Sequence, residues 1–338
     1  MITRSPQAVE PDTWQRELRE AYRDPLRLLA DLDLSALAHT IDRASPFAFR
    51  VTRAFAARMR RGDAADPLLR QVLPLTCERD VHAGFVADPL AEHAQGRGAL
   101  LHKYHGRALL IASGACAINC RYCFRREFPY GPSLGGAAMH RAFGAIAADS
   151  SIEELILSGG DPLVLDDAAL ADLIARAGAI AHLARLRVHT RLPIVLPARV
   201  TPGLGRTLRT TRLRIVVVVH CNHAQEIDDD VRAALARLRE AGATVLNQAV
   251  LLRGVNADVD TLAALSNALF DAGVLPYYVN VLDRVRGTAH FDCEDARAAA
   301  LERALRARLP GYLVPRFVRE VPAAPAKLPL AEATRDDP

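Results

Sequence analysis

Between residues 108 and 125 the chain reads Ala108-Leu-Leu-Ile-Ala-Ser-Gly-Ala-Cys116-Ala-Ile-Asn-Cys120-Arg-Tyr-Cys123-Phe-Arg125. The apolar run Ala108 to Ala112 has the length and composition of a buried strand. Three cysteines follow within eight residues, so they fall on the loop at the carboxyl end of that strand. Parallel α/β folds place their active sites at this edge. The stretch therefore predicts a functional cysteine site on a parallel sheet.

The spacing of Cys116, Cys120 and Cys123 allows the three thiols to converge on one metal centre. Three cysteines leave a tetrahedral zinc or a cubane cluster one ligand short. A structural zinc normally has four protein ligands, whereas an iron that binds a cofactor needs an open position. The alternative is a set of buried, unreactive cysteines. The other three cysteines, Cys77, Cys221 and Cys293, are expected to be packing residues.

Alternating strand and helix patterns continue through the rest of the chain. Strand-like runs occupy residues 108–112, 154–157, 186–189, 213–219, 244–251 and 276–282. Amphipathic helical stretches lie between them, at 166–182, 228–241 and 258–272, and a further helix is expected at 293–309. Repeated strand–helix units require a parallel sheet with crossover helices. Six units predict a partial (β/α)6 barrel of the α/β class.

Three regions are predicted from these patterns. Residues 1–95 carry helical periodicity and no strand signal, and residues 96–310 form the partial barrel. Residues 311–338 contain a strand candidate at 312–318, a loop rich in proline and alanine at 321–330, and a flexible charged tail. The histidines His220 and His223 lack a nearby third ligand, so we expect satisfied polar contacts rather than metal ligation.

Composition excludes several classes of function. A net charge of +4 over 338 residues does not favour nucleic-acid binding. No apolar run reaches the roughly 20 residues needed to cross a bilayer, and no signal peptide is evident, so we expect a soluble cytoplasmic protein without a membrane partner. Only two of the 43 basic residues are lysines, Lys103 and Lys327. Any chemistry that needs a side-chain amine is restricted to these two residues.

The motif Cys-x3-Cys-x2-Cys, with Tyr122 before the last cysteine, resembles that of the radical S-adenosylmethionine superfamily. The resemblance implies a [4Fe-4S] cluster whose open iron binds S-adenosylmethionine. The run Ser158-Gly159-Gly160-Asp161 ends the second predicted strand and resembles the superfamily segment that holds the amino group of S-adenosylmethionine. Its glycines would let the backbone approach a bound ligand closely.

From about Leu101 to Leu330 the chain resembles the lysine 2,3-aminomutase family within that superfamily. The similarity is carried by His102-Lys-Tyr104, Cys123-Phe-Arg-Arg126, Leu192 to Arg199, His220-Cys-Asn-His223, Asn247 to Asn256, Pro276-Tyr-Tyr278, Gly287 to Phe291, and Phe317 to Glu320. The resemblance implies pyridoxal 5′-phosphate on Lys327. It also implies that Lys103 and Arg107 bind the cofactor phosphate and that Gln248 lies near the cofactors.

The resemblance further implies how an amino acid is bound. Arg125 matches the arginine that pairs with the substrate carboxylate, and a forked guanidinium suits a carboxylate. Asp283 and Glu320 match the two positions that grip the distal ammonium of L-lysine. Two acidic residues favour a cationic side chain and disfavour glutamate as the substrate.

The short form of the chain and Pro325-Ala-Lys327 resemble the branch that makes (R)-β-lysine for elongation factor P. Its implied partners are L-lysine, an electron donor such as flavodoxin or ferredoxin, and a link to an elongation factor P ligase, and a homo-oligomer is expected. Asn280 departs from the tyrosine of catabolic lysine enzymes. The alternatives are an arginine or catabolic lysine aminomutase, another radical S-adenosylmethionine enzyme, or a non-enzymatic zinc or cluster protein.

Overall fold

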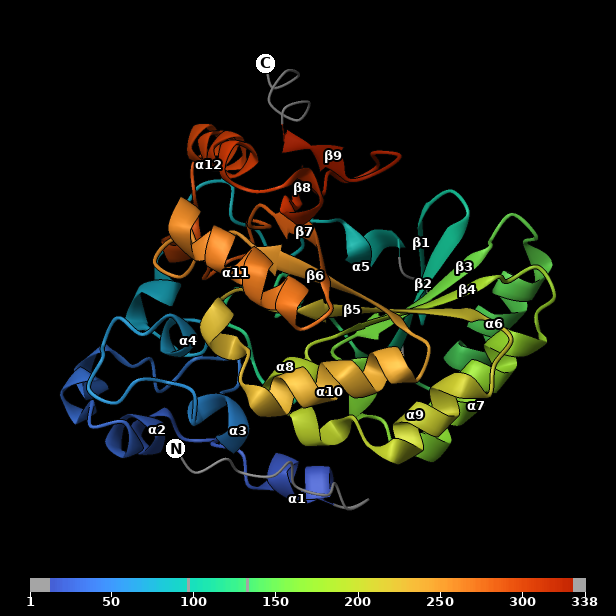
Figure 1. Ribbon diagram of the computed structural model, residues 1–338, viewed down its shortest axis with the longest axis horizontal. Helices are drawn as coiled ribbons and strands as arrows, with labels where there is room; N and C mark the ends of the chain where they lie inside the picture. Colours follow the sequence, from blue (N-terminus) through green and yellow to red (C-terminus); the bar gives the residue numbers. More distant parts are fainter. Residues whose placement is uncertain (1–12, 96–97, 132–133, 331–338) are drawn as a thin grey trace.

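The computed structural model describes residues 13–95, 98–131 and 134–330. Within these ranges a nine-stranded sheet, with its strands in sequence order, forms the centre of the molecule (Figure 1). The strands β2 to β8 run parallel, and the outer strands β1 and β9 are antiparallel to their neighbours. The strand bounds are β1 Leu100–Tyr104, β2 Arg107–Ser113, β3 Glu154–Gly159, β4 Arg185–Thr190, β5 Arg214–His220, β6 Thr244–Val250, β7 Leu275–Asn280, β8 Arg316–Arg319 and β9 Leu328–Pro329.

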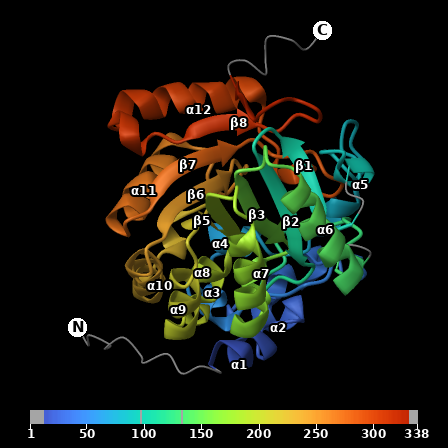
Figure 2. The ribbon, with the colours of Figure 1, turned by 90° about the vertical axis from the view of Figure 1, so that its right-hand side faces the viewer.

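Helices connect the parallel strands and cover the outer face of the curved sheet (Figure 2). Asp166, Asp228 and Asp258 each cap the start of a helix with a side-chain oxygen, as expected for good N-cap residues. The arrangement confirms the predicted partial barrel, with six strand–helix units followed by β8. The connecting helices are α6 Gly136–Ala148, α7 Asp167–Ala179, α8 Leu192–Val195, α9 Pro202–Arg209, α10 Asp229–Glu240, α11 Val259–Asp271 and α12 Asp295–Arg308.

The sheet extends beyond the predicted strands at both edges. Strand β1 was not predicted, because His102, Lys103 and Tyr104 make its second half polar, although Leu101 pairs with Leu109 of β2. The strand expected at residues 312–318 is shorter, since Tyr312 belongs to the 3-10 turn η8 (Gly311–Leu313) that follows Pro310. Strand β9 lies within the predicted loop and pairs with β8.

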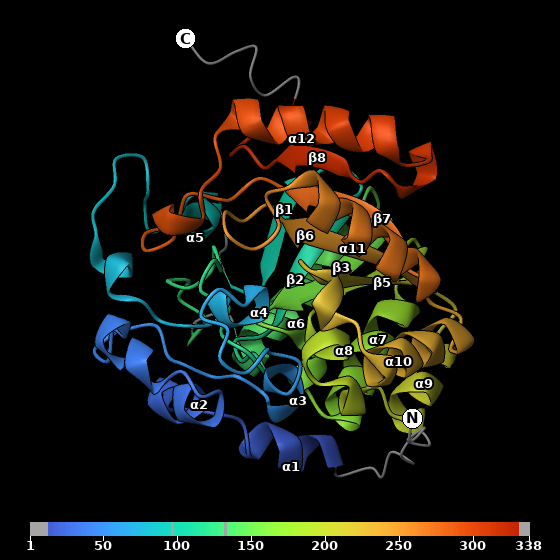
Figure 3. The same ribbon diagram turned by 60° about the vertical axis from the view of Figure 1, so that its left-hand side comes forward.

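Most of the short helices of the N-terminal region lie across the side of the barrel opposite α12 (Figure 3), whereas the last of them, Glu92–Gln95, lies beside β1. Sequence periodicity suggested longer helices, but the observed ones have only four to seven residues. They share one hydrophobic core with the barrel, from Trp14 to Leu330. Residues 1–12 and the predicted charged tail at 331–338 lie outside the described residues. The segments are α1 Thr13–Arg19, α2 Pro25–Asp31, η1 Ser35–Thr40, α3 Arg53–Ala56, α4 Pro67–Arg70, η2 Thr76–Arg79 and α5 Glu92–Gln95.

Side chains alternate between the two faces of each strand, and this alternation positions the site. In β4, Leu186 and Val188 are buried, whereas Arg187 and His189 line a cavity inside the barrel. None of the helices in the described part of the chain is long and apolar enough to cross a membrane.

Candidate active site

One cavity of about 310 Å³ lies at the carboxyl ends of the parallel strands. It is lined by residues from the cysteine loop, from several barrel strands and from the C-terminal segment. The site residues expected from the sequence all line this single cavity, although the segments that carry them span residues 103–327. They are Lys103, Arg107, Cys116, Cys120, Cys123, Arg125, Ser158, Gly159, Gly160, Asp161, Gln248, Asp283, Glu320 and Lys327.

The cysteine loop is held by the N-terminal region. The Arg50 guanidinium donates to the Cys116 carbonyl at 2.9 Å, and the amide of Arg121 donates to the Gln71 carbonyl at 2.9 Å. The Arg121 side chain is fully buried and ion-paired with Glu78. Glu78 also pairs with Arg126 at 2.7 Å. The N-terminal helices therefore fix the loop that carries the thiols.

The three cysteines of the loop line the same cavity. No group of three or more His, Cys, Asp or Glu side chains within the described ranges is placed to hold a single metal ion. In a cubane cluster each cysteine binds a different iron, so its thiols need not meet at one point. Burial and the neighbouring Cys120 raise the pKa of Cys123 to about 11, and burial also raises that of Cys116. Thiolates this buried need a cationic partner, which iron supplies.

The glycine turn after β3 packs against the cysteine loop. A Cβ on Gly159 would lie 2.3 Å from the Ser113 carbonyl oxygen, and one on Gly160 would lie 2.4 Å from that of Ala115. Gly159 also has φ +121°, which favours glycine. The sequence suggested that these glycines allow a ligand to approach. The structure gives them a further reason, which is the close approach of two loops.

Asp161 is largely engaged within the protein. Its carboxylate accepts hydrogen bonds from the Thr190 hydroxyl at 2.7 Å and from the Arg191 amide at 2.6 Å. It also caps the turn at Leu163. These contacts brace the end of β4 against the cysteine side of the site, so contact between this carboxylate and S-adenosylmethionine stays a prediction.

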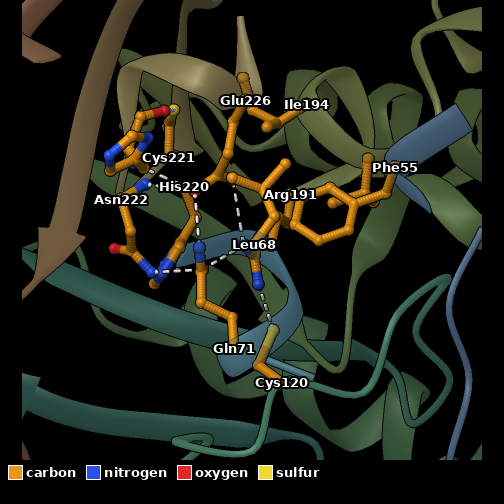
Figure 4. Close-up of polar contacts among 12 residues, drawn as sticks. Phe55, Leu68, Gln71, Cys120, Arg191, Ile194, His220, Cys221, Asn222 and Glu226 are labelled. Atoms are coloured by element: carbon orange, nitrogen blue, oxygen red, sulfur yellow. Dashed lines mark hydrogen bonds and ion pairs between the residues drawn. The ribbon is translucent and has the colours of Figure 1, made fainter. Parts of the chain in front are cut away.

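A buried polar network lies directly behind Cys120 (Figure 4). The Arg191 guanidinium donates to the Cys120 sulfur at 2.7 Å and to Gln71 at 2.7 Å, and it pairs with Glu226 at 3.0 Å. Asn222 donates to Gln71 at 2.9 Å. A donor held on a thiolate stabilises its negative charge, which makes Arg191 a residue that can tune a cluster bound there.

The two histidines flagged in the sequence have protein partners, as expected. His220 Nε2 lies 3.1 Å from the Tyr122 hydroxyl, and burial lowers the pKa of His220 to about 3. His223 Nδ1 accepts from the Gln225 amide at 3.1 Å.

Lys327 lines the same cavity as the cysteines. Its ammonium donates to Asn280 at 2.8 Å and pairs with Glu320 at 3.1 Å. Glu320 also pairs with Lys103 at 2.8 Å. Although burial opposes ionisation, Lys327 and Lys103 lower the pKa of Glu320 to about 2. Both side-chain amines of the protein therefore meet at one carboxylate.

The donor set around Lys327 fits pyridoxal phosphate. Lys327 offers the amine, and Lys103 and Arg107 offer cationic groups for a phosphate. The buried Nε2 atom of His189, in the same cavity lining, has no hydrogen-bond partner among the described residues. Burial lowers the pKa of His189 well below its usual value, so the imidazole is neutral and free to bond a ligand.

Sequence reasoning missed Glu92, Arg191 and His189. Glu92 forms a two-bond ion pair with Arg125, at 2.7 and 2.9 Å, and a second pair with Lys103 at 2.9 Å. It belongs to no strand and to no quoted family stretch. In the sequence, Glu92 could have been recognised only as an acidic residue in a region with helical periodicity.

Comparisons with known proteins agree with this geometry. A family model described as a 4Fe-4S single cluster domain matches residues 95–184, which contain the cysteine loop and the glycine turn. A half-open parallel barrel with these cysteines at its mouth is typical of the iron–sulfur enzymes of the radical S-adenosylmethionine class.

Three curated relatives are L-lysine 2,3-aminomutases. The Escherichia coli (strain K12) protein is 47% identical over 94% of both chains. The Haemophilus influenzae protein is 42% identical over 98% of this chain and 99% of its own length. The Clostridium subterminale protein is 35% identical over 79% of this chain and 65% of its own length. The chain belongs to the L-lysine 2,3-aminomutase family, and the prediction of an isomerase is confirmed.

Proposed function

We propose that this enzyme converts L-lysine to (R)-β-lysine, using a [4Fe-4S] cluster, S-adenosylmethionine and pyridoxal phosphate. The observation that carries the proposal is the convergence of three cysteines and both lysines of the chain on one cavity. When bound, the cluster and S-adenosylmethionine supply radical chemistry, and pyridoxal phosphate supplies the group that carries the migrating nitrogen.

We assign the residues of the cavity as follows. Lys327 binds pyridoxal phosphate covalently, Lys103 and Arg107 bind its phosphate, and Gln248 lies beside the cofactors. Cys116, Cys120 and Cys123 hold the cluster. The segment Ser158 to Asp161 borders S-adenosylmethionine.

The proposed substrate site has one basic residue for the carboxylate of the substrate and two acidic residues for its ammonium group. Arg125 binds the α-carboxylate, and Asp283 and Glu320 bind the distal ammonium. Glu320 pairs with Lys103 and Lys327. These two lysines would hold pyridoxal phosphate, which would leave Glu320 available to a cationic substrate.

The two lysines provide a direct test of the cofactor assignment. Borohydride treatment of the pyridoxal-loaded protein should fix the cofactor on Lys327, as read by mass spectrometry of peptides. Lys327→Ala should lose the fixed cofactor completely, whereas the matched Lys103→Ala variant should retain it and bind pyridoxal phosphate more weakly. Fixation on Lys103, or fixation that survives in Lys327→Ala, would contradict the assignment.

The substrate is tested by turnover. Anaerobic protein with cluster, both cofactors and a reductant should convert lysine to β-lysine, measured by chromatography of the derivatised amino acids. Arginine and glutamate are the comparison substrates. Absence of β-lysine from fully loaded protein would exclude the proposal, and faster turnover of arginine would favour an arginine aminomutase.

The product is proposed to serve the modification of elongation factor P through a ligase. One sequence feature that supports this branch is Pro325-Ala-Lys327 in the cofactor segment. Adding the enzyme and lysine to elongation factor P and its ligase should produce the β-lysylated factor. Flavodoxin or ferredoxin is the proposed reductant, and a homo-oligomer is the proposed assembly.

A further inference from the structure

Glu92 lies between two cationic residues of the site, Arg125 and Lys103. The proposed function gives Glu92 itself no role. Arg125 Nε donates to one carboxylate oxygen at 2.7 Å and Arg125 Nη2 donates to the other at 2.9 Å. The Lys103 ammonium lies 2.9 Å from the second oxygen. The Glu92 side chain is only 3% exposed. Glu92 therefore uses both of its carboxylate oxygens to link Arg125, which is proposed to bind the substrate carboxylate, to Lys103, which is proposed to bind the cofactor phosphate.

The contact with Glu92 orients the Arg125 guanidinium. A guanidinium can meet a carboxylate along its Nε–Nη2 edge or along its Nη1–Nη2 edge. Glu92 occupies the first edge, and Nη1 points to the Ser158 hydroxyl at 3.1 Å and the Gly159 carbonyl at 3.3 Å. A substrate carboxylate can bind the second edge by replacing these two longer contacts.

Glu92 also balances the charge of its partners. Burial alone would raise the pKa of Glu92, but Arg125 and Lys103 outweigh that effect and lower it. Without this carboxylate, Arg125 would lose its partner and the Arg125 and Lys103 cations would repel each other in a buried setting.

The backbone holds Glu92 in place. The Asp88 carboxylate accepts from the amides of Glu92 at 3.0 Å and His93 at 2.8 Å. Ala91, which precedes Glu92, has φ +52°, a conformation that costs a residue with a Cβ some free energy. The chain therefore accepts local strain in order to direct this carboxylate into the cavity beside β1.

We infer that Glu92 is a positioning residue that holds Arg125 and Lys103 in a fixed orientation. The substrate carboxylate and the cofactor phosphate then bind in the correct positions relative to each other. The inference rests on the proposed function, which assigns these two anchors. Loss of Glu92 lowers substrate affinity and leaves Lys327 able to carry the cofactor.

The test is a titration of the cluster- and pyridoxal-loaded protein with lysine. The absorption of the cofactor serves as the readout of binding. Glu92→Gln keeps the size of the side chain and removes its charge, and the dissociation constant for lysine should rise about tenfold or more, the effect of losing one charge-assisted contact. Borohydride should still fix the cofactor on Lys327. KM should rise by the same factor, with a smaller change in kcat.

Asp42→Asn is the matched control. Asp42 is also 3% exposed and ion-paired with an arginine, Arg79, but it lies outside the cavity lining. Its loss should lower the melting temperature and leave lysine affinity unchanged. Glu92→Asp, which keeps the charge and shortens its reach, should fall between wild type and Glu92→Gln, and it provides the measurement if Glu92→Gln does not fold.

Two results would overturn the inference. Unchanged affinity in Glu92→Gln and Glu92→Asp would make Glu92 a structural ion pair only. Tighter binding in Glu92→Gln would mean that Glu92 competes with substrate for Arg125.

If wild-type protein itself binds no lysine, the proposed function fails and this inference fails with it. If wild type binds and Glu92→Gln binds equally well, only the inference fails.

Discussion

The residues of the cavity form a chain of alternating charges. Arg125 pairs with Glu92, Glu92 with Lys103, Lys103 with Glu320 and Glu320 with Lys327. Each buried charge has a partner of opposite sign, which offsets the cost of burying it. Ligands that bring their own phosphate, carboxylate and ammonium groups can exchange these partners without leaving a charge unpaired.

If Asp283 binds the distal ammonium as proposed, the affinity for a cationic substrate should depend on pH. Burial and the nearby Glu320 raise the pKa of Asp283 to about 7, against the opposing effect of Lys327. Its carboxyl is ionised above that pH and neutral below it, so lysine should bind more tightly as the pH rises through about 7. Below the pKa, affinity should fall by up to about tenfold per pH unit.

Calorimetric titrations with lysine across this range measure the effect. Asp283→Asn should bind more weakly and lose this pH dependence, because the amide does not titrate. Affinity in wild type that stays constant across neutral pH would contradict the role of Asp283.

Among the elements, the turn after β3 and the cysteine loop depend on each other. Gly160 donates to the Ser113 carbonyl at 2.6 Å and Asp161 donates to that of Ala115 at 2.8 Å. These bonds extend the pairing of β2 and β3 beyond the strands. The position of the thiols is therefore set by two neighbouring strand ends rather than by the cysteine loop alone.

Gly160→Ala should destabilise the fold and the cluster site together. The added Cβ would lie 2.4 Å from a backbone oxygen, which cannot move like a flexible side chain. We expect a loss of about 1–3 kcal/mol in the free energy of unfolding. Denaturant unfolding and the iron content of reconstituted protein measure the two effects.

Gly144→Ala provides the contrast within helix α6. A Cβ at Gly144 meets nothing within 4 Å, so alanine should stabilise the protein by about 0.5–1 kcal/mol. Equal stability and equal iron content in the two variants would show that the turn tolerates a side chain.

Across the molecule, the N-terminal helices and the barrel share one hydrophobic core and are joined by ion pairs around the site. Arg121 is fully buried and lies between two cysteines, while its partner Glu78 comes from η2 in the N-terminal region. At the other end, Lys103 of β1 pairs with Glu320 beyond β8, so ion pairs cross the gap between the two sheet edges. Distant parts of the chain therefore complete the site.

Glu78→Gln should be one of the most damaging substitutions away from the cavity. It leaves Arg121 and Arg126 without a charged partner, and breaking a buried pair costs about 3–5 kcal/mol. Denaturant unfolding and the yield of cluster reconstitution should both fall. Glu153→Gln removes an exposed pair with Arg185 and should cost less than about 1 kcal/mol. Similar losses in the two variants would refute the proposed role of Glu78.

The amino-acid sequence was sufficient for the order of the parallel strands β2 to β8, because hydrophobic periodicity is a local property. It was also sufficient for the grouping of the cysteines and for limiting any side-chain amine to Lys103 and Lys327, since the chain has only two lysines. All fourteen site residues expected from it line one cavity. Their individual roles stay predictions.

Only the tertiary structure decided which polar groups meet. The contacts Arg125–Glu92, Lys327–Asn280 and Arg191–Cys120 join residues 33, 47 and 71 positions apart. No local pattern encodes such pairs, because they depend on how strand ends converge at the mouth of the barrel. The same holds for the outer strands β1 and β9, whose residues become strands by pairing with a neighbour rather than by their own propensity.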